Sequence, residues 1–194
     1  MIELELKSVV DDLAARRARV EHAGALLTFE GRLEDRRYDT PEASLGARDH
    51  VLRTRSYIDA AGRRAELHWK GPTMQEKGYK KRDEIGTAVD DAETLAAILD
   101  RLGYVVTTCI DRDIIQFDLD GTTIRFERYP RMDILVEVEG TPEGIERAIA
   151  VLGLPRNGFN ADRLADFTLR YEARTGVRAA ICDAELEASV NVHG

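Results

Sequence analysis

At least six segments of this chain alternate charged and aliphatic side chains, and each is predicted to be a β-strand. Successive side chains of a strand point to opposite faces, so each of these strands has one charged face and one apolar face. The clearest case is residues 2–7 (Ile-Glu-Leu-Glu-Leu-Lys), where Glu3, Glu5 and Lys7 share the charged face. Alone, this strand is typical of a half-buried edge strand with a solvated face. The repetition of the pattern is therefore what constrains the fold.

The later strands carry charges of both signs. Their charged faces are predicted to hold Arg53 and Arg55 in residues 51–58, Glu66, His68 and Lys70 in 65–70, Lys80, Arg82 and Glu84 in 80–85, Arg112 in 111–119, Arg125 and Glu127 in 123–127, and Glu137 and Glu139 in 133–140. An open sheet could turn these charges to water, whereas a closed barrel would place them in its lumen with the aliphatic faces packed under helices. A charged lumen is costly unless opposite charges pair or a charged ligand fills it.

The chain is predicted to form about eight strands and about four helices. The helices are expected at residues 8–27, 90–102, 141–152 and 161–175, from their apolar periodicity and their capping residues. The charged run 30–37 is interpreted as a solvated loop, and residues 73–79 as a flexible connection. We expect one domain over residues 1–176, followed by a loosely ordered tail over residues 177–194.

Bulk composition excludes several classes of function. The net charge of −8 over 194 residues argues against a general nucleic-acid binder. No apolar run approaches the ~20 residues of a membrane span, and the first residues enter a charged strand directly, so neither a membrane segment nor a signal peptide is expected. Cys109 and Cys182 have no metal-ligand spacing and indicate reduced thiols in a cytoplasmic protein. A homodimer is the default expectation for the oligomeric state.

The charges differ in type from strand to strand. Paired carboxylates occur at Glu3 and Glu5 and at Glu137 and Glu139, and cations occur at Lys7, Arg53, Arg55, Lys70, Arg82 and Arg112. Carboxylate oxygens are the ligands that Mg²⁺ or Mn²⁺ prefers, and guanidinium and ammonium groups suit phosphate oxygens. The combination predicts a metal-assisted site for a polyphosphate, in which cations spread the charge of the transition state.

Two points stay open at the level of single residues. Lys80 and Lys81 are adjacent, so only one of them can face the lumen. Glu66 and His68 either line the lumen or act as ion-paired spacers.

Several short motifs together resemble the CYTH family, the triphosphate tunnel metalloenzymes, over roughly residues 1–175. In the order of the family they are Glu3-Leu4-Glu5-Leu6-Lys7, Tyr38-Asp39-Thr40, Arg53-x-Arg55, Trp69-Lys70-Gly71-Pro72, Lys81-Arg82-Asp83-Glu84-Ile85 and Val136-Glu137-Val138-Glu139-Gly140. This family includes class IV adenylate cyclases, thiamine triphosphatases and inorganic triphosphatases. The resemblance implies an α+β fold, an eight-stranded antiparallel β-barrel with a charged interior that forms the triphosphate tunnel and is flanked by helices.

The resemblance also implies roles for individual residues. The expected metal ligands are Glu3, Glu5, Glu137 and Glu139, and the expected triphosphate contacts are Lys7, Arg53, Arg55, Lys70 and Arg82. Glu84 is expected to orient these cations. Together with Glu3, Glu5 and Lys7 it forms the expected catalytic set.

Two departures from the family pattern affect the site. The family's Lys-x-Arg after the middle helix corresponds to Arg112 and Ile114, so one phosphate contact is missing, and Arg125 on a neighbouring strand is its expected substitute. The family's Asp after the hairpin corresponds to Glu127, which is the expected further metal ligand.

The leading hypothesis is an Mg²⁺- or Mn²⁺-dependent enzyme acting on ATP, tripolyphosphate or thiamine triphosphate. The Lys-Gly-Pro and Arg-Asp-Glu-Ile segments favour a class IV adenylate cyclase, which converts ATP to cyclic AMP and pyrophosphate. An inorganic triphosphatase or another triphosphate phosphohydrolase is the close alternative. A non-catalytic binder of phosphorylated ligands, and a structural barrel with solvated faces, are the remaining alternatives.

Overall fold

The computed structural model describes residues 2–76 and 78–190, without the side chains of Ile2, Glu3, Glu76 and residues 187–190. The expected ligand Glu3 is therefore placed by its backbone alone. The elements are β1 (Ile2–Val9), α1 (Leu13–His22), β2 (Leu26–Asp39), β3 (Val51–Asp59), β4 (Gly62–Lys70), β5 (Met74–Glu76), β6 (Tyr79–Val89), α2 (Ala92–Arg101), β7 (Val105–Leu119), β8 (Thr122–Arg128), β9 (Leu135–Glu139), α3 (Pro142–Leu152), α4 (Leu164–Thr175) and α5 (Asp183–Val190), with two short 3₁₀ turns at Gly46–Arg48 and Arg156–Gly158.

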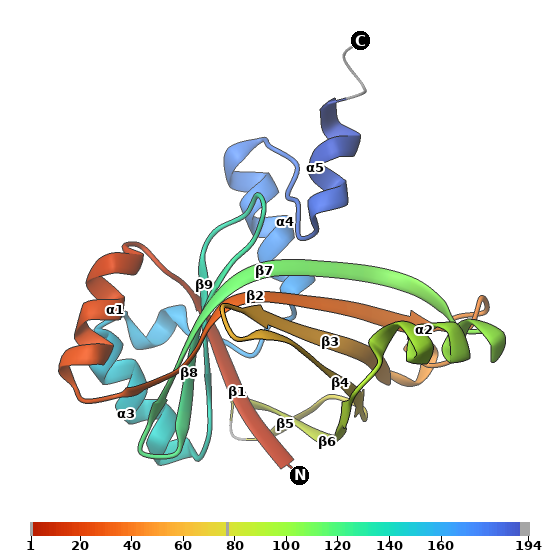
Figure 1. Cartoon of the computed structure of the whole chain (residues 1–194). Coiled ribbons are helices and arrows are strands. Elements are labelled where there is room, and N and C mark those ends of the chain that lie inside the picture. Colours follow the sequence, from red (N-terminus) through yellow and green to blue (C-terminus); the bar gives the residue numbers. More distant parts are fainter. Residues whose placement is uncertain (1, 77, 191–194) are drawn as a thin grey trace.

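Eight strands in the described part of the chain close into a ring (Figure 1). Their order is β1-β9-β8-β7-β2-β3-β4-β6, and β6 returns to β1. Every neighbouring pair is antiparallel, and the three-residue strand β5 adds to β6. The predicted α+β fold, an eight-stranded antiparallel barrel flanked by helices, is confirmed.

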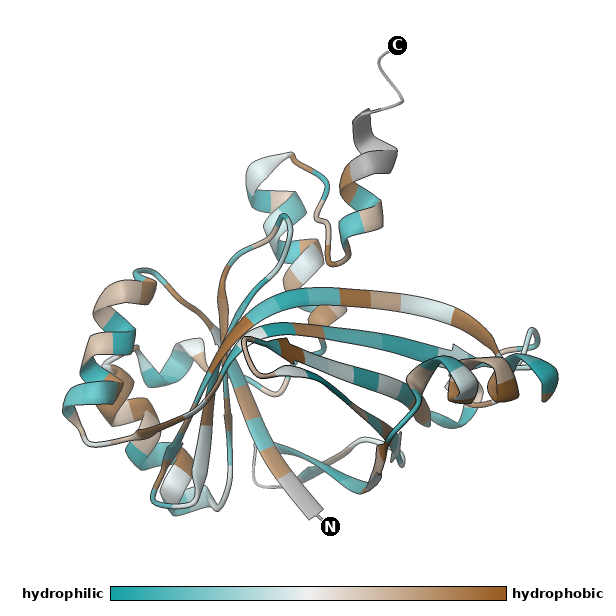
Figure 2. Cartoon of the chain, viewed as in Figure 1, coloured by the Kyte–Doolittle hydropathy of each residue, from teal (hydrophilic) through white to brown (hydrophobic). Residues whose placement is uncertain are grey.

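The strand registers show which side chains point into the lumen, because directly paired residues share a face. Glu5 pairs with Glu139 on one side and with Lys80 on the other, and Lys7 pairs with Glu137. Hydrophobic and hydrophilic bands alternate along β1 in Figure 2, as expected for a strand with two unlike faces. The charged faces that the sequence predicts therefore meet inside the barrel.

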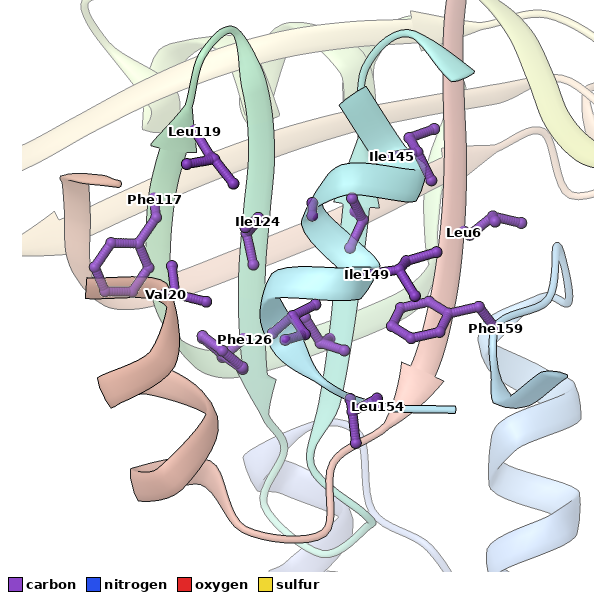
Figure 3. Packing of buried hydrophobic residues seen from close by; sticks show 14 of the residues in the cluster. Leu6, Val20, Phe117, Leu119, Ile124, Phe126, Ile145, Ile149, Leu154 and Phe159 are labelled. Carbon is purple, nitrogen blue, oxygen red and sulfur yellow. The ribbon is translucent and has the colours of Figure 1, made fainter. Parts of the chain in front are cut away.

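The apolar faces of β1, β7, β8 and β9 form the main core outside the barrel, where α1 and α3 cover them (Figure 3). This cluster includes Leu6, Val20, Phe117, Leu119, Ile124, Phe126, Val136, Val138, Ile145, Ile149, Leu154 and Phe159. Phe117 and Phe126 meet edge to face, with ring centroids 6.4 Å apart. Burying this surface under helices stabilises the barrel at roughly 25 cal/mol per Å² of apolar area.

Apolar side chains also fill one end of the lumen. Phe29, Leu33, Tyr57 and Ile114 form a separate buried cluster on the inner faces of β2, β3 and β7. We call these four residues the lumen plug. Ile114, which replaces an expected arginine, is 1 % exposed within this cluster. A guanidinium there would lie among apolar side chains, so the departure at Ile114 is explained by packing.

The charged run over residues 30–37 was predicted to be a solvated loop, and this prediction is wrong. It lies inside β2, between β3 and β7. Every second side chain of the run faces the lumen, and Leu33 and Asp35 are buried there. Ion pairs with the neighbouring strands make a charged strand stable at this position, which a local charge count does not reveal.

The four predicted helices are present with shorter bounds. The first begins only at Leu13, because β1 continues to Val9 and the Asp12 carboxylate caps the helix by accepting from the backbone N–H of Ala15. Thr141 caps α3 in the same way, and Gly153 ends it in a left-handed conformation. Residues 73–79, predicted as a flexible connection, contain β5.

The segment after residue 176 contacts the barrel. Ala180 is fully buried and exchanges two backbone hydrogen bonds with Arg131, of 2.8 and 3.0 Å. The carbonyl of Ile181 accepts from the backbone N–H of Asp111 on β7. These contacts fasten residues 180–181 to the barrel. Among the described helices, none is long and apolar enough to cross a membrane.

Candidate active site

A cavity of about 210 Å³ occupies the charged part of the lumen. It is lined by Asp35, Arg37, Arg53, Arg55, Tyr57, His68, Lys70, Glu84, Ile110, Arg112, Arg125, Glu127, Tyr129, Glu137, Glu139 and Leu164. Most of these side chains are charged. Tyr57 of the lumen plug and Leu164 of α4 both contribute to this lining.

Three carboxylates converge at the cavity, and two of them, Glu137 and Glu139, belong to its lining. One oxygen each from Glu5, Glu137 and Glu139 can be chosen so that all three lie within 4.8 Å of one another. Lys7 and Lys80 form ion pairs with this group, Lys7 with Glu137 and Lys80 with Glu5. Burial raises the pKa of Glu5, but Lys7 and Lys80 outweigh it and hold the pKa far below its usual range.

This donor set fits a hard divalent cation. Carboxylate oxygens from two adjacent strands, β1 and β9, converge at a spacing that one ion can span. The register places Glu3 on the same face of β1 as Glu5, two residues away. The predicted ligands Glu5, Glu137 and Glu139 are thus brought together by the fold.

Another part of the lining is organised by one buried carboxylate. Asp35 on β2 is 1 % exposed and accepts two hydrogen bonds from Arg55, of 2.7 and 2.9 Å. Arg112 donates to it at 3.1 Å, and Nη1 of Arg53 lies 3.6 Å away. Burial raises the pKa of Asp35, but the three arginines hold it well below the usual range. Asp35 is therefore the counter-ion that keeps three guanidinium groups inside the barrel.

Two guanidinium groups that line the cavity each have one N–H donor without a hydrogen-bond acceptor in the described part of the chain. These donors are the Nε atoms of Arg37 and Arg53, and both atoms are buried. Burial and the neighbouring Arg55 lower the pKa of Arg53 to about 10, so it still carries its charge at neutral pH. Because buried donors are almost always paired in native proteins, these two atoms indicate a bound ligand with acceptor oxygens.

Glu127, predicted as a metal ligand, lies apart from the group of three. One of its oxygens accepts from Arg112 at 2.8 Å, and the other accepts from the hydroxyl of Tyr129 at 2.8 Å. Burial raises the pKa of Glu127, but Arg112, Lys7 and Arg125 together lower it to about 2. In this arrangement Glu127 positions Arg112.

The lowered pKa of Glu127 predicts a loss of stability in acid. The folded pKa lies below the unfolded value of about 4.3, so the ionised carboxylate stabilises the fold above that pH, by about 2–3 kcal/mol. This contribution is lost as the pH falls from about 5 towards 2. We expect Glu127→Gln to show a shallower decline of unfolding free energy between pH 6 and 3, measured by urea titration. Equal slopes for the variant and the wild type would contradict this account.

The remaining predicted residues occupy distinct places. Lys70 forms an ion pair with Glu84, and both line the cavity. Arg125 donates to Glu137 at 2.7 Å and to Gln116 at 2.8 Å, which holds it beside the three carboxylates.

Arg82 is placed differently. Its guanidinium donates to the backbone carbonyls of Gly71 and Asp49, and it does not belong to the cavity lining in the described part of the chain.

Sequence reasoning missed two positions of the candidate site. Asp35 and Arg37 were assigned to a loop, although residues 31, 33, 35 and 37 alternate in the way that a strand requires. That alternation was the available signal. The choice between Lys80 and Lys81 is also clear, because Lys80 is the one that binds Glu5.

The closed antiparallel barrel with charges of both signs on its inner wall defines this chain as a β-tunnel protein. The model of the CYTH domain matches residues 1–139, which is well over half of the chain. The chain belongs to the CYTH family, as its motifs indicated. The search among curated proteins found no match.

Solved structures share this fold. A proposed adenylate cyclase from Vibrio parahaemolyticus is 21% identical, with a TM-score of 0.73 over 86% of this chain and 97% of that chain. The PH1819 protein from Pyrococcus horikoshii is 22% identical, with a TM-score of 0.72 over 87% and 98%. HpAC1 from Hippeastrum, for which a dominant triphosphatase activity is described, is 15% identical, with a TM-score of 0.59 over 90% and 95%. At these identities the likeness supports the fold alone.

Proposed function

We propose that this protein is a metal-dependent enzyme that acts on a triphosphate inside the barrel. One observation carries the proposal: Arg37 and Arg53, whose buried Nε atoms lack a hydrogen-bond partner in the described part of the chain, line the same cavity as two of the three converging carboxylates, Glu137 and Glu139. A polyanion alone would be repelled by the carboxylates, and a cation alone would be repelled by the arginines. A triphosphate bound together with a divalent cation satisfies both groups of charges.

The proposed ligands of Mg²⁺ or Mn²⁺ are Glu5, Glu137 and Glu139, with Glu3 as a further candidate. When bound there, the cation supplies charge neutralisation and polarisation of the phosphate group. The residues proposed to bind phosphate oxygens are Arg37, Arg53, Arg55, Lys70, Arg112 and Arg125, with Lys7 beside the carboxylates. Glu84 orients Lys70, and Asp35 orients Arg55 and Arg112. We place Arg82 in a supporting role at the loops that it joins.

The first candidate reaction is cyclisation of ATP to cyclic AMP and pyrophosphate. The segments Lys70-Gly71-Pro72 and Arg82-Asp83-Glu84-Ile85 favour it by their likeness to the class IV cyclases. In this reaction the side chains hold the triphosphate so that the 3′-hydroxyl of the same molecule reaches the α-phosphorus.

Hydrolysis of a triphosphate by water is the second candidate, and the size of the cavity favours it. A volume of about 210 Å³ is smaller than the ~300–1,000 Å³ of sites for drug-sized ligands. Its lining is charged almost throughout, so a triphosphate group suits it and a nucleoside would extend outside. Tripolyphosphate and thiamine triphosphate are the candidate substrates of this reaction.

A panel assay tests the proposal and separates the two reactions. We expect turnover of at least one of ATP, tripolyphosphate and thiamine triphosphate with Mg²⁺ or Mn²⁺, and none after removal of metal with EDTA. Cyclic AMP formed from ATP supports cyclisation. Phosphate release without cyclic AMP supports hydrolysis. Tight binding of tripolyphosphate with no turnover of any of the three would identify a non-catalytic binder and overturn the proposed activity.

We also propose a cellular setting and partners for this protein. Both cysteines are free thiols, which agrees with a cytoplasmic location. The net charge of −8 supports a small anionic substrate in a locally basic lumen over nucleic acid as partner. A homodimer remains the default expectation.

A further inference from the structure

Among the residues that the structure describes, His68 on β4 is the one histidine in the lining of the cavity. The registers place it opposite Arg53 of β3 on one side and opposite Gly86 of β6 on the other. Its ring lies against Gly86, where an added Cβ would be 3.4–3.5 Å from three ring atoms. The glycine therefore leaves the space in which the imidazole lies. Neither the metal ligands nor the phosphate contacts proposed above use this side chain.

His68 lies between the cavity and the outer surface of the barrel. It also lines a second hollow of about 280 Å³, together with Glu66, Gly86, Thr87 and Ala88. Three of these residues (Gly86, Thr87 and Ala88) are exposed, and the His68 side chain itself is 19 % exposed. A proton taken up from the cavity side by the imidazole can thus leave to solvent on the other side.

Glu66 orients the imidazole. Its Oε2 lies 2.9 Å from Nε2 of His68, and its Oε1 accepts from Arg64 at 2.8 Å. A carboxylate accepts a hydrogen bond, so Nε2 carries the proton and donates it to Glu66. The lone pair then remains on Nδ1, which is the arrangement of a histidine base oriented by a carboxylate.

The surrounding charges keep the imidazole neutral. Burial lowers the pKa of His68 below its ordinary value, and Arg53 and Arg55 of β3 lower it further, while Glu66 raises it in part. On β6 the facing residue is Gly86, which carries no charge.

The next charges along this face are those of Lys70 and Glu84, which neutralise each other in an ion pair. The base form of His68 is therefore the populated one at neutral pH.

We propose that His68, oriented by Glu66, is the general base that deprotonates the oxygen attacking the triphosphate. The inference rests on the proposed function. As the bond from oxygen to phosphorus forms, the proton of the attacking hydroxyl or water passes to Nδ1 of His68. The phosphoanhydride bond breaks, and its electron pair leaves with the departing phosphate or pyrophosphate. Imidazolium then releases the proton to solvent through the outer hollow, which restores the base.

Kinetics of three variants test this role. For His68→Gln we expect kcat to fall about 10²- to 10³-fold, with little change in the Kd of tripolyphosphate. Glu66→Gln should retain the acid limb of the pH profile of kcat/KM but move it to lower pH, because the carboxylate raises the pKa of His68. His22→Gln is the matched control, since His22 is exposed on α1. The substrate also titrates in this pH range, and its titration affects both proteins equally. Dividing kcat/KM of the wild type by kcat/KM of His68→Gln at each pH therefore leaves only the titration of the enzyme.

Chemical rescue separates a proton acceptor from a structural role. We expect added imidazole to restore part of the turnover of His68→Ala, and to leave the wild type and the His22→Gln control unchanged. If His68→Gln retains wild-type kcat at every pH, or if imidazole has no effect on His68→Ala, the proposed role of His68 is wrong.

A binding measurement keeps the inference testable apart from turnover. In histidine-labelled protein, the NMR signal missing from His68→Gln identifies His68, and we expect its pKa to rise by at least about one unit when tripolyphosphate binds with Mg²⁺. Binding without this rise would overturn the role of His68 alone. Failure of the wild type to bind tripolyphosphate at all, seen by calorimetry, would overturn the proposed function and with it this inference.

Discussion

Replacing Glu137 by Gln is expected to reduce metal-dependent turnover at least about 100-fold. Glu137 forms ion pairs with Lys7 and Arg125, and one of its carboxylate oxygens lies within 4.8 Å of oxygens of Glu5 and Glu139. Glutamine keeps the shape and loses the charge. Loss of outer contacts to a metal ligand alone costs about 10- to 100-fold, so loss of a ligand should cost at least as much. Turnover with the active triphosphate, titrated with Mn²⁺, is the measurement.

Two controls make this result specific. Glu42→Gln removes one carboxylate from an exposed loop position and should match the wild type. Calorimetric titration with Mn²⁺ should show weaker binding in Glu137→Gln while its melting curve stays cooperative. Unchanged Mn²⁺ affinity in a folded Glu137→Gln protein would exclude Glu137 from the metal site.

Replacing Asp35 by Ala is expected to lower the unfolding free energy by about 3–5 kcal/mol. The change leaves Arg53, Arg55 and Arg112 buried without their shared counter-ion, and breaking a buried ion pair from one side typically costs this much. Urea unfolding at pH 7 measures the effect. Tripolyphosphate should return part of the lost stability, because an anion in the cavity replaces the missing carboxylate.

The matched control lies next to Asp35 on the same strand. Glu34 points to the other face of β2 and pairs with Arg63, whose side chain is 54 % exposed. Exposed pairs contribute little, so Glu34→Ala should cost no more than about 1 kcal/mol. If Asp35→Ala and Glu34→Ala lose similar amounts, then Asp35 is not the counter-ion that the geometry indicates.

The barrel could be predicted from the sequence because its signal is local and repeated. Alternation of charge and aliphatic residues identifies a strand with two unlike faces, and Glu3, Glu5, Glu137 and Glu139 are recognisable within two such strands. The four helices follow from apolar periodicity and caps, with errors of a few residues at their ends. The proposed metal ligands on β1 and β9 were therefore accessible to sequence reasoning.

The remaining features depend on partners distant in sequence. Asp35 is stable inside β2 only because Arg55 and Arg112 reach it from β3 and β7. A run that holds so many charges is locally typical of a loop, and this misled the prediction for residues 30–37. The pairing of Glu127 with Arg112 of the neighbouring strand, and the lumen plug around Ile114, likewise depend on packing that no single stretch encodes.

The ring closure through β1 has a consequence for how the chain acquires its structure. Leu6 pairs with Val138, so the pairing of β1 with β9 joins residues that lie more than a hundred positions apart in the chain. Contacts this distant carry a large loop-closure entropy and slow folding. The carboxylates of β1 and β9 come together only when this pairing forms. A divalent cation that binds them would favour the closed ring over its open precursors, so metal concentration during folding would affect the yield of native protein.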